Sequence, residues 1–387
     1  MLSFLLLLLT AIPIYSESRG TAHIPLPAEL NGTLNGSEYK IRVPGNWNGT
    51  LVVYCHAAVS GALQVAPATF PQASPTLEEQ LLQRGYALAG SFYPDSEKEA
   101  PLRTLALTNF FNGHVGQPRR TIVWGLSIGG TAALELIEGH HAIYDAAIAV
   151  SSLAGGGPLD ADASLRCAVA YAAAFGWPSD WWGPIEDLRD DIYGNEGALM
   201  GPVFRWADAG NLAQWEFIRL IMKLPSAAWW DVDPLIGFQG YFLAAWKGIA
   251  FRSRAEQLYG GPVAQNVGAF YSLSASDKAY LLTLGLNADN LLAWMNAHAN
   301  ITARNSARQH LAHYGNPTGN LRRPVVTMHA ILDPDISVSH EAVYRAKAEA
   351  TGSAGLLVQA FANAWHASFS ADQYLAALAA IEHWLDT

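Results

Sequence analysis

The chain of 387 residues has little cysteine and little charge. Its two cysteines, Cys55 and Cys167, allow at most one intrachain bridge, which excludes a disulfide scaffold and leaves a bond or two thiols open. Charged residues make up only 14% of the chain and sum to a net charge of −10. This acidic balance argues against nucleic acid or an anionic membrane as the main partner.

Long hydrophobic runs are also scarce. The one that stands out, Met1–Thr10, is too short to span a bilayer and is followed by Pro13 and small polar residues. It is typical of a secretory signal peptide cleaved after Ser16, although an apolar N-terminal strand is the alternative. Glycosylation sequons agree with secretion and begin at Asn31, Asn35, Asn48 and Asn300. We expect residues 1–16 to be removed and the secreted protein to carry no membrane anchor.

The remaining sequence is apolar and alternates between strand-like and helical runs. Apolar residues make up 51% of the chain, enough for a large core. A hairpin is expected at 28–44, with Asn31-Gly32 and Asn35-Gly36 as turn dipeptides. Strands are then expected at 51–56, 86–92, 122–124, 144–153, 324–330 and 355–361. Further helices are expected at 76–84, 101–111, 340–351 and 372–385. The alternation predicts an α/β fold with a mostly parallel, doubly wound sheet.

A tryptophan-rich stretch interrupts this alternation. Ala154–Pro158 resembles a flexible hinge, and no convincing strand follows until about Asn320. We therefore predict a sheet domain formed by 17–153 and 321–387, with a helical cap at 154–320. We expect most cap tryptophans to pack its core, and the alternative for a minority is that they line an apolar pocket over Ser127. These tryptophans are Trp177, Trp181, Trp182, Trp206, Trp215, Trp229, Trp230, Trp246 and Trp294.

The segment Gly125–Gly129 has the pattern G-x-S-x-G and joins an apolar run, Ile122–Trp124, to a helical pattern that ends at Gly139. Glycines suit a sharp turn there, because a Cβ would meet neighbouring backbone. The turn would expose the hydroxyl of Ser127 at the end of the sheet and at a helix N-terminus, as in a nucleophile elbow. An ordinary glycine-rich turn is the alternative, so the rest of a catalytic constellation is needed.

Two later segments supply candidate partners for this serine. A serine hydroxyl needs a neighbouring base, which a third group orients. Asp333 and Asp335 lie in a turn after the strand at 324–330, and Asp333 fits the distance from the strand end better. His366 lies in a short loop between the last strand and the last helix. With Ser127 first, this is the order found in the α/β-hydrolase superfamily.

The chain resembles that superfamily, and in particular its secreted, capped esterases. The resemblance implies an α/β-hydrolase fold with a large helical cap insertion. It also implies that Ser127 is the nucleophile, His366 the general base and Asp333 the acid, with Asp335 as the alternative acid.

An oxyanion hole requires two backbone N–H donors. The resemblance assigns one to Ile128, directly after the nucleophile, and the other to the loop after the strand at 51–56. Family members often have His-Gly in that loop, whereas this chain has His56-Ala57-Ala58. Ala58 is the candidate donor, with Ala57 as the second choice.

Motifs for metals and cofactors are missing. His310-Leu-Ala-His313 lacks the glutamate of a zinc-protease motif, and His140 and His141 point apart at a helix end. The sequence has no Walker loop and no G-x-G-x-x-G pattern. We therefore expect no metal site and no cofactor.

The function predicted from these residues is hydrolysis of a small-molecule carboxylic ester with a hydrophobic or aromatic group, through an acyl-enzyme. A capped aminopeptidase is one alternative, and it would need an acidic anchor for the substrate amine. Glu186, Asp187 and Asp190-Asp191 are candidates for that anchor, or simply a solvated helix face. A binding protein built on the same scaffold is the other alternative.

Overall fold

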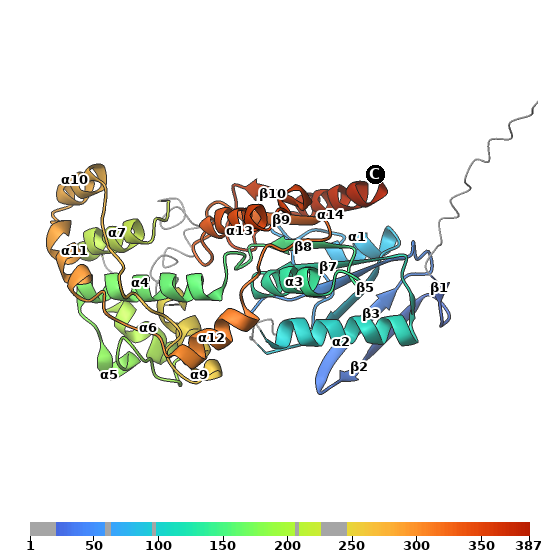
Figure 1. Ribbon diagram of the computed structural model, residues 1–387, viewed down its shortest axis with the longest axis horizontal. Coiled ribbons are helices and arrows are strands. Elements are labelled where there is room, and N and C mark those ends of the chain that lie inside the picture. The colour runs from blue at the N-terminus through green and yellow to red at the C-terminus, as the bar shows by residue number, and fades with distance from the viewer. Residues whose placement is uncertain (1–20, 59–62, 95–97, 206–208, 226–245) are drawn as a thin grey trace, which may run out of the picture.

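A computed structural model of the chain describes residues 21–58, 63–94, 98–205, 209–225 and 246–387 (Figure 1). The predicted signal peptide, residues 1–16, lies outside the described residues. In the described ranges no helix is long and apolar enough to cross a lipid bilayer.

The fold is built on an eight-stranded sheet in the order β10-β9-β8-β7-β4-β5-β3-β2. The strands from β10 to β5 run parallel, whereas β3 pairs antiparallel with β5, and β2 antiparallel with β3. The strands are β2 (Ala28–Leu34), β3 (Ser37–Val43), β4 (Thr50–Cys55), β5 (Ala87–Ser91), β7 (Arg120–Leu126), β8 (Ala146–Val150), β9 (Val325–Ala330) and β10 (Leu357–Ala362). A small separate sheet pairs β1 (Thr21–Ala22) with β6 (Gly116–Gln117). The predicted mostly parallel sheet is confirmed.

The hairpin of β2 and β3 turns at Asn35-Gly36. Both residues have positive φ angles, 51° and 80°, as a two-residue turn between twisted strands requires. Asn31-Gly32, the other turn dipeptide predicted for this hairpin, instead lies inside β2, where Asn31 pairs with Lys40. The prediction of a turn there was wrong, because the longer strand pairing outweighs the local preference of the dipeptide.

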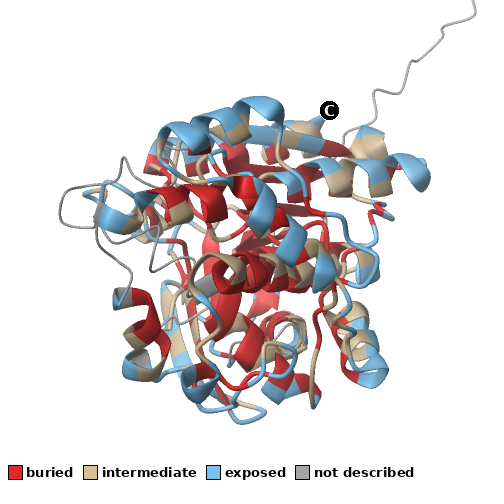
Figure 2. Cartoon of the chain, turned by 90° about the vertical axis from the view of Figure 1, so that its left-hand side faces the viewer, coloured by how far each residue is buried: buried red, intermediate tan, exposed pale blue. Residues whose placement is uncertain are grey.

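Helices cover both faces of the sheet. Successive residues of a strand point to opposite faces, so Trp124 of β7 packs with α1 (Leu77–Gln83) and α14 (Ala371–Asp386). Its neighbour Val123 packs on the other side, where the helices are α2 (Glu99–His114), α3 (Ile128–Gly139) and α13 (Ser339–Ala350). A short helix, η5 (Ala354–Leu356), precedes β10. Burial on both faces explains why the central strands are apolar throughout (Figure 2).

The predicted cap, 154–320, is helical where the structure describes it and lies beside the sheet domain, at the left in Figure 1. Its elements are α4 (Gly157–Phe175), α5 (Ser179–Trp182), α6 (Glu196–Phe204), η1 (Ala209–Asn211), α7 (Leu212–Ile221), η4 (Trp246–Ala250), α9 (Phe251–Tyr259), α10 (Ala275–Thr283), α11 (Ala288–Ala297) and α12 (Asn305–Tyr314). They enclose a hydrophobic core of their own, in which Trp182 and Trp215 are fully buried. Trp181 and Trp294 are about one-third exposed, at 38% and 37%. Trp206, Trp229 and Trp230 lie outside the described residues.

The junction between sheet and cap is tightly packed. Residues 154–157 are all buried, and α4 begins within the glycine run at Gly157. A Cβ on Gly157 would lie 2.7 Å from the side chain of Leu311, and one on Gly155 would lie 2.9 Å from His340 Nδ1. The glycines therefore serve close packing of α4 against its neighbours, which the predicted flexible hinge did not anticipate.

Both cysteines are buried thiols that no disulfide joins. Cys55 ends β4 and Cys167 lies in α4. Burial raises the pKa of Cys55 to about 12, although its hydrogen bond with Thr104 opposes the rise. A thiol with this pKa is a poor nucleophile at neutral pH.

We predict that Trp215→Ala destabilises the protein by about 3–5 kcal/mol, because it empties a fully buried site in the cap core. Phe270→Ala is the matched control, since that aromatic ring is 82% exposed and its loss should change stability by less than about 0.5 kcal/mol. Chemical denaturation followed by circular dichroism measures both. Equal midpoints for the two variants would contradict the packing described for the cap.

Candidate active site

The turn between β7 and α3 holds Ser127 in a strained conformation. Its φ of 58° and ψ of −123° lie in a region that residues with a side chain rarely adopt, at a cost of about 1–3 kcal/mol. A Cβ on Gly125 would lie 1.9 Å from the carbonyl oxygen of Gly129. Only glycine fits at Gly125, and this is the geometric reason for the spacing seen in the sequence.

The second glycine of the motif joins the turn to the neighbouring strand β4. A Cβ on Gly129 would lie 2.2 Å from the carbonyl oxygen of Cys55 and 2.5 Å from that of His56. The N-terminus of α3 therefore touches the end of β4 directly. This close approach puts Ser127 next to the loop that contains Ala58.

Asp333 and His366 form a hydrogen-bonded pair at the ends of β9 and β10. His366 Nδ1 lies 2.7 Å from Asp333 Oδ2. The second oxygen, Oδ1, accepts the backbone N–H groups of Asp335 and Ile336 at 3.0 and 2.9 Å. The carboxylate is thus fixed from both sides. Of the two candidate acids, Asp333 pairs with His366, whereas Asp335 donates its backbone N–H to the Asp333 carboxylate.

Opposing effects act on the pKa of the Asp333 carboxyl group. The carboxylate is fully buried, and burial alone would raise its pKa. The interaction with His366, that with His329 and the N–H group of Ile336 outweigh burial, so the pKa of Asp333 lies below its usual value. Asp333 is therefore an anion at neutral pH. The side chain of His366 remains 19% exposed, which leaves it accessible to a ligand.

Ser127 and His366 line one cavity together with both predicted oxyanion donors, Ile128 and Ala58. The cap closes this cavity with mostly apolar groups. The lining residues from the cap include Ala161, Phe251, Ala255, Leu258, Val263 and Leu311. Asp160, Arg252, Arg254 and Asp335 add charge to its wall.

Tryptophan does not line this cavity in the described part of the cap. Trp177, Trp182 and Trp215 pack in the cap core instead. Trp294 lines a separate hollow, together with Glu186 and Asp187, two of the acidic residues considered as an amine anchor. Glu186 and Asp187 thus line a different hollow from Ser127.

His56 shapes the loop that carries Ala58. Its Nε2 accepts the N–H of Tyr93 at 3.2 Å, so the proton lies on Nδ1, which donates to the carbonyl of Ala57 at 2.6 Å. The imidazole also stacks on the Tyr93 ring with centroids 3.8 Å apart. Both ring nitrogens have structural partners, which supports a role in loop geometry for His56.

The strand order now decides the fold family. β4 and β7 are neighbours, but the chain continues from β4 to β5 towards one edge of the sheet and from β7 to β8 towards the other edge. The position between β4 and β7 is therefore a topological switch point, the place where sheets of this type bind ligands. Ser127 follows β7, the Ala58 loop follows β4, and the acid and the histidine follow β9 and β10. The chain has the α/β-hydrolase fold. Within the described ranges, no group of three or more His, Cys, Asp or Glu residues could hold a metal ion.

Comparisons with known proteins add little to this assignment. No family model matches the chain. An o-phthalyl amidase from Xanthobacter agilis is 29% identical over 139 residues, which cover 34% of this chain and 28% of that protein. The chain thus spans less than a third of that relative.

The similar solved structures include an acylaminoacyl peptidase from Pyrococcus horikoshii and feruloyl esterase B from Aspergillus oryzae. The first has a TM-score of 0.39 and 10% identity, and covers 90% of this chain and 37% of its own. The second has a TM-score of 0.39 and 11% identity, and covers 88% and 73%. At this level the likeness adds nothing to what the strand order already establishes.

Sequence reasoning missed the groups behind the acid. His329 and Glu341 are fully buried next to Asp333, and His329 Nε2 lies 3.7 Å from Asp333 Oδ2. A signal was present, because a histidine inside the apolar strand 324–330 needs buried hydrogen-bond partners. Those partners are Glu341 on α13 and the carbonyl oxygen of Ile336 in the turn after β9, and strand periodicity does not identify them.

We predict that Gly129→Ala disrupts the site, because the new Cβ would separate α3 from the end of β4. The expected loss of stability is about 3 kcal/mol, with loss of Ser127 labelling by a fluorophosphonate probe. Gly113→Ala in α2 is the control, since a Cβ there has no neighbour within 4 Å and should change stability by less than about 1 kcal/mol. Thermal melts and labelling test both variants. A Gly129→Ala protein with normal stability and labelling would refute the close contact.

Proposed function

We propose that the protein is a serine hydrolase that cleaves a carboxylic ester through an acyl-enzyme. The observation that carries this proposal is the His366–Asp333 pair in the same cavity as the strained Ser127. A base held by an acid, in the same cavity as a half-buried serine at a helix N-terminus, is the arrangement that activates serine.

The proton positions define the roles. His366 Nδ1 donates to Asp333, so the lone pair on Nε2 accepts the proton of Ser127 Oγ as this oxygen attacks the ester carbonyl. The imidazolium then protonates the leaving alcohol, and the acyl group stays on Ser127. Water, activated by the same nitrogen, releases the acid and restores the serine. Asp333 stabilises the imidazolium in both steps.

The oxyanion of each tetrahedral intermediate needs donors before it forms. We assign these donors to the backbone N–H groups of Ile128 and Ala58, which line the cavity with Ser127. The N-terminus of α3 adds its partial positive charge at the same place. The contact of Gly129 with β4 keeps the two loops together.

The apolar lining of the cavity favours a hydrophobic or aromatic acyl or alcohol group as the substrate. Secretion remains part of the proposal, supported by the N-terminal hydrophobic run and by three exposed sequon asparagines. Those exposed asparagines are Asn31, Asn35 and Asn300.

Amide hydrolysis is the second candidate. It is favoured by the partial similarity to the Xanthobacter o-phthalyl amidase, whose name describes an amide with an aromatic acyl group. An aminopeptidase is less well supported, because Glu186 and Asp187 line a different hollow from Ser127.

We expect Ser127→Ala to lower kcat for p-nitrophenyl ester hydrolysis by at least about 10³-fold without a change in melting temperature. His366→Gln should have a similar effect, and Asp333→Asn should lower kcat by about 10⁴-fold by changing the tautomer of His366. Ser272→Ala, at an exposed position of the cap, is the control. Undiminished turnover by Ser127→Ala would exclude the proposed nucleophile.

An ester and an amide with the same acyl group separate the two candidates. We expect the p-nitrophenyl ester of benzoic acid to be cleaved with a kcat/KM above that of the acetate by about 10-fold or more, because the apolar wall buries the ring. The ester should also exceed the matching anilide. A kcat/KM for 2-carboxybenzoyl amides above that of every ester tested would instead favour the amidase.

A further inference from the structure

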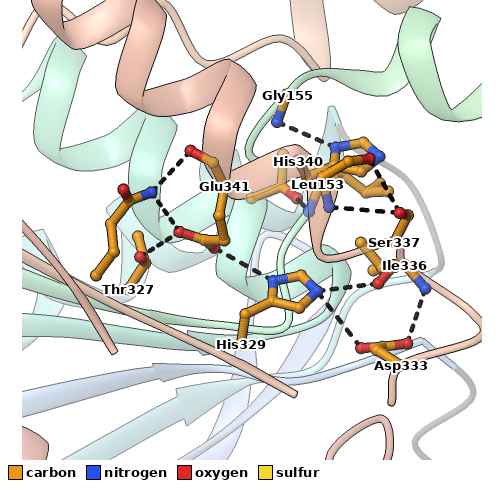
Figure 3. Close-up of polar contacts among 12 residues, drawn as sticks. Leu153, Gly155, Thr327, His329, Asp333, Ile336, Ser337, His340 and Glu341 are labelled. Carbon is orange, nitrogen blue, oxygen red and sulfur yellow. Dashed lines mark hydrogen bonds and ion pairs between the residues drawn. The ribbon is translucent and has the colours of Figure 1, made fainter. Parts of the chain in front are cut away.

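Behind the Asp333 carboxylate lies a fully buried histidine that the proposed mechanism does not use (Figure 3). His329 extends from β9, with Nε2 2.9 Å from the carbonyl oxygen of Ile336 and 3.7 Å from Asp333 Oδ2. Its Nδ1 faces Glu341 Oε1 on α13 at 3.2 Å. Acceptor oxygens therefore face both nitrogens of the ring.

The donor and acceptor count fixes the number of protons in this cluster. A neutral imidazole has one N–H and one lone pair, and that lone pair would point at an oxygen. Glu341 Oε2 already accepts hydrogen bonds from Thr327 and Gln359, so this carboxylate acts as an acceptor. Either His329 carries two protons, or Glu341 carries one on Oε1. Imidazole is more basic than a carboxyl group by about two pKa units, and a second anion, Asp333, lies on its other side.

Electrostatics leads to the same proton arrangement. Burial alone would lower the pKa of His329, but the hydrogen bond with Glu341 and the charges of Asp333 and Glu341 outweigh it, so the pKa is raised. One buried cation between two buried carboxylates also reduces the unpaired charge in the core.

His340 provides a contrast within the same region. It is also buried, at 2% exposure, but its Nδ1 accepts the N–H of Gly155 at 3.1 Å. That nitrogen therefore carries no proton. Two buried histidines near each other in Figure 3 thus differ in protonation because their hydrogen-bond partners differ.

We propose that His329 is a positioning residue: a buried imidazolium whose charge keeps Asp333 ionised beside His366. This rests on the proposed serine-hydrolase function. His329 touches no substrate and acts through Asp333 alone.

A charge on His329 affects the acid limb of the pH profile, where activity falls as His366 becomes protonated. The charged groups around the Asp333–His366 pair include His329 from β9, Glu341 behind it on α13, and Asp335 from the turn. The cavity wall adds Asp160, Arg252 and Arg254. A cation behind Asp333 disfavours a second positive charge on His366, which helps His366 to stay neutral as the pH falls. Loss of the cation lets His366 bind its proton at a higher pH.

The test compares His329→Gln with His340→Gln as the matched buried control. We expect the acid limb of kcat/KM for a p-nitrophenyl ester to move up by about one pH unit in His329→Gln and to stay unchanged in His340→Gln. Both variants lose a buried ring, so a stability loss common to both does not produce this difference. An acid limb of His329→Gln that superimposes on that of the wild type overturns the proposal.

A second measurement needs no activity and no variant of His329. In Ser127→Ala protein labelled with ¹⁵N-histidine, the two ring nitrogens of His329 should both have the chemical shifts of protonated nitrogen at neutral pH. One protonated and one unprotonated nitrogen would place the proton on Glu341 and overturn the proposal. Turnover by Ser127→Ala at the wild-type rate would refute the hydrolase function instead, and the NMR result would still decide the charge of His329.

Discussion

The contact between α3 and the end of β4 is the constraint on which the site depends. It forms at Gly129, where even a methyl group would lie 2.2 Å from the carbonyl oxygen of Cys55. Ser127, two residues before this contact, has an unusual backbone conformation. The packing of two secondary-structure elements therefore balances the backbone strain at Ser127, and the proposed oxyanion donors Ile128 and Ala58 line the same cavity.

The acid side of the site is held by a different kind of force. Asp333 is fully buried, yet its two oxygens receive two backbone N–H groups and His366. His329 and Glu341 extend this arrangement into the core, so that charges of opposite sign alternate from the cavity inward. Buried charge is costly when it is unpaired, and this alternation keeps Asp333 ionised at low cost.

Much of this could be predicted from the sequence, and the limits have physical causes. The turn at Ser127 and the choice of Asp333 over Asp335 followed from local spacing, because a strand followed by a short turn leaves few positions for a side chain. The turn predicted at Asn31-Gly32 is absent because the pairing of β2 with β3, a nonlocal interaction, outweighs the local preference of the dipeptide. The partners of His329 come from α13 and the turn beyond β9, and they depend on tertiary packing that periodicity does not encode.

The cap is the part of the chain for which the sequence predicts least. Its apolar residues either fill its core or line the cavity, and both kinds look alike in sequence. Trp182 and Trp215 fill its core, whereas Phe251 and Leu258 face the cavity. Hydrophobicity alone does not separate a residue that stabilises the cap from one that contacts substrate. The sheet domain holds the proposed catalytic groups, and the cap supplies most of the apolar wall. Under the proposed function, substrate preference is therefore free to change with the cap while the Ser127, His366 and Asp333 geometry stays fixed.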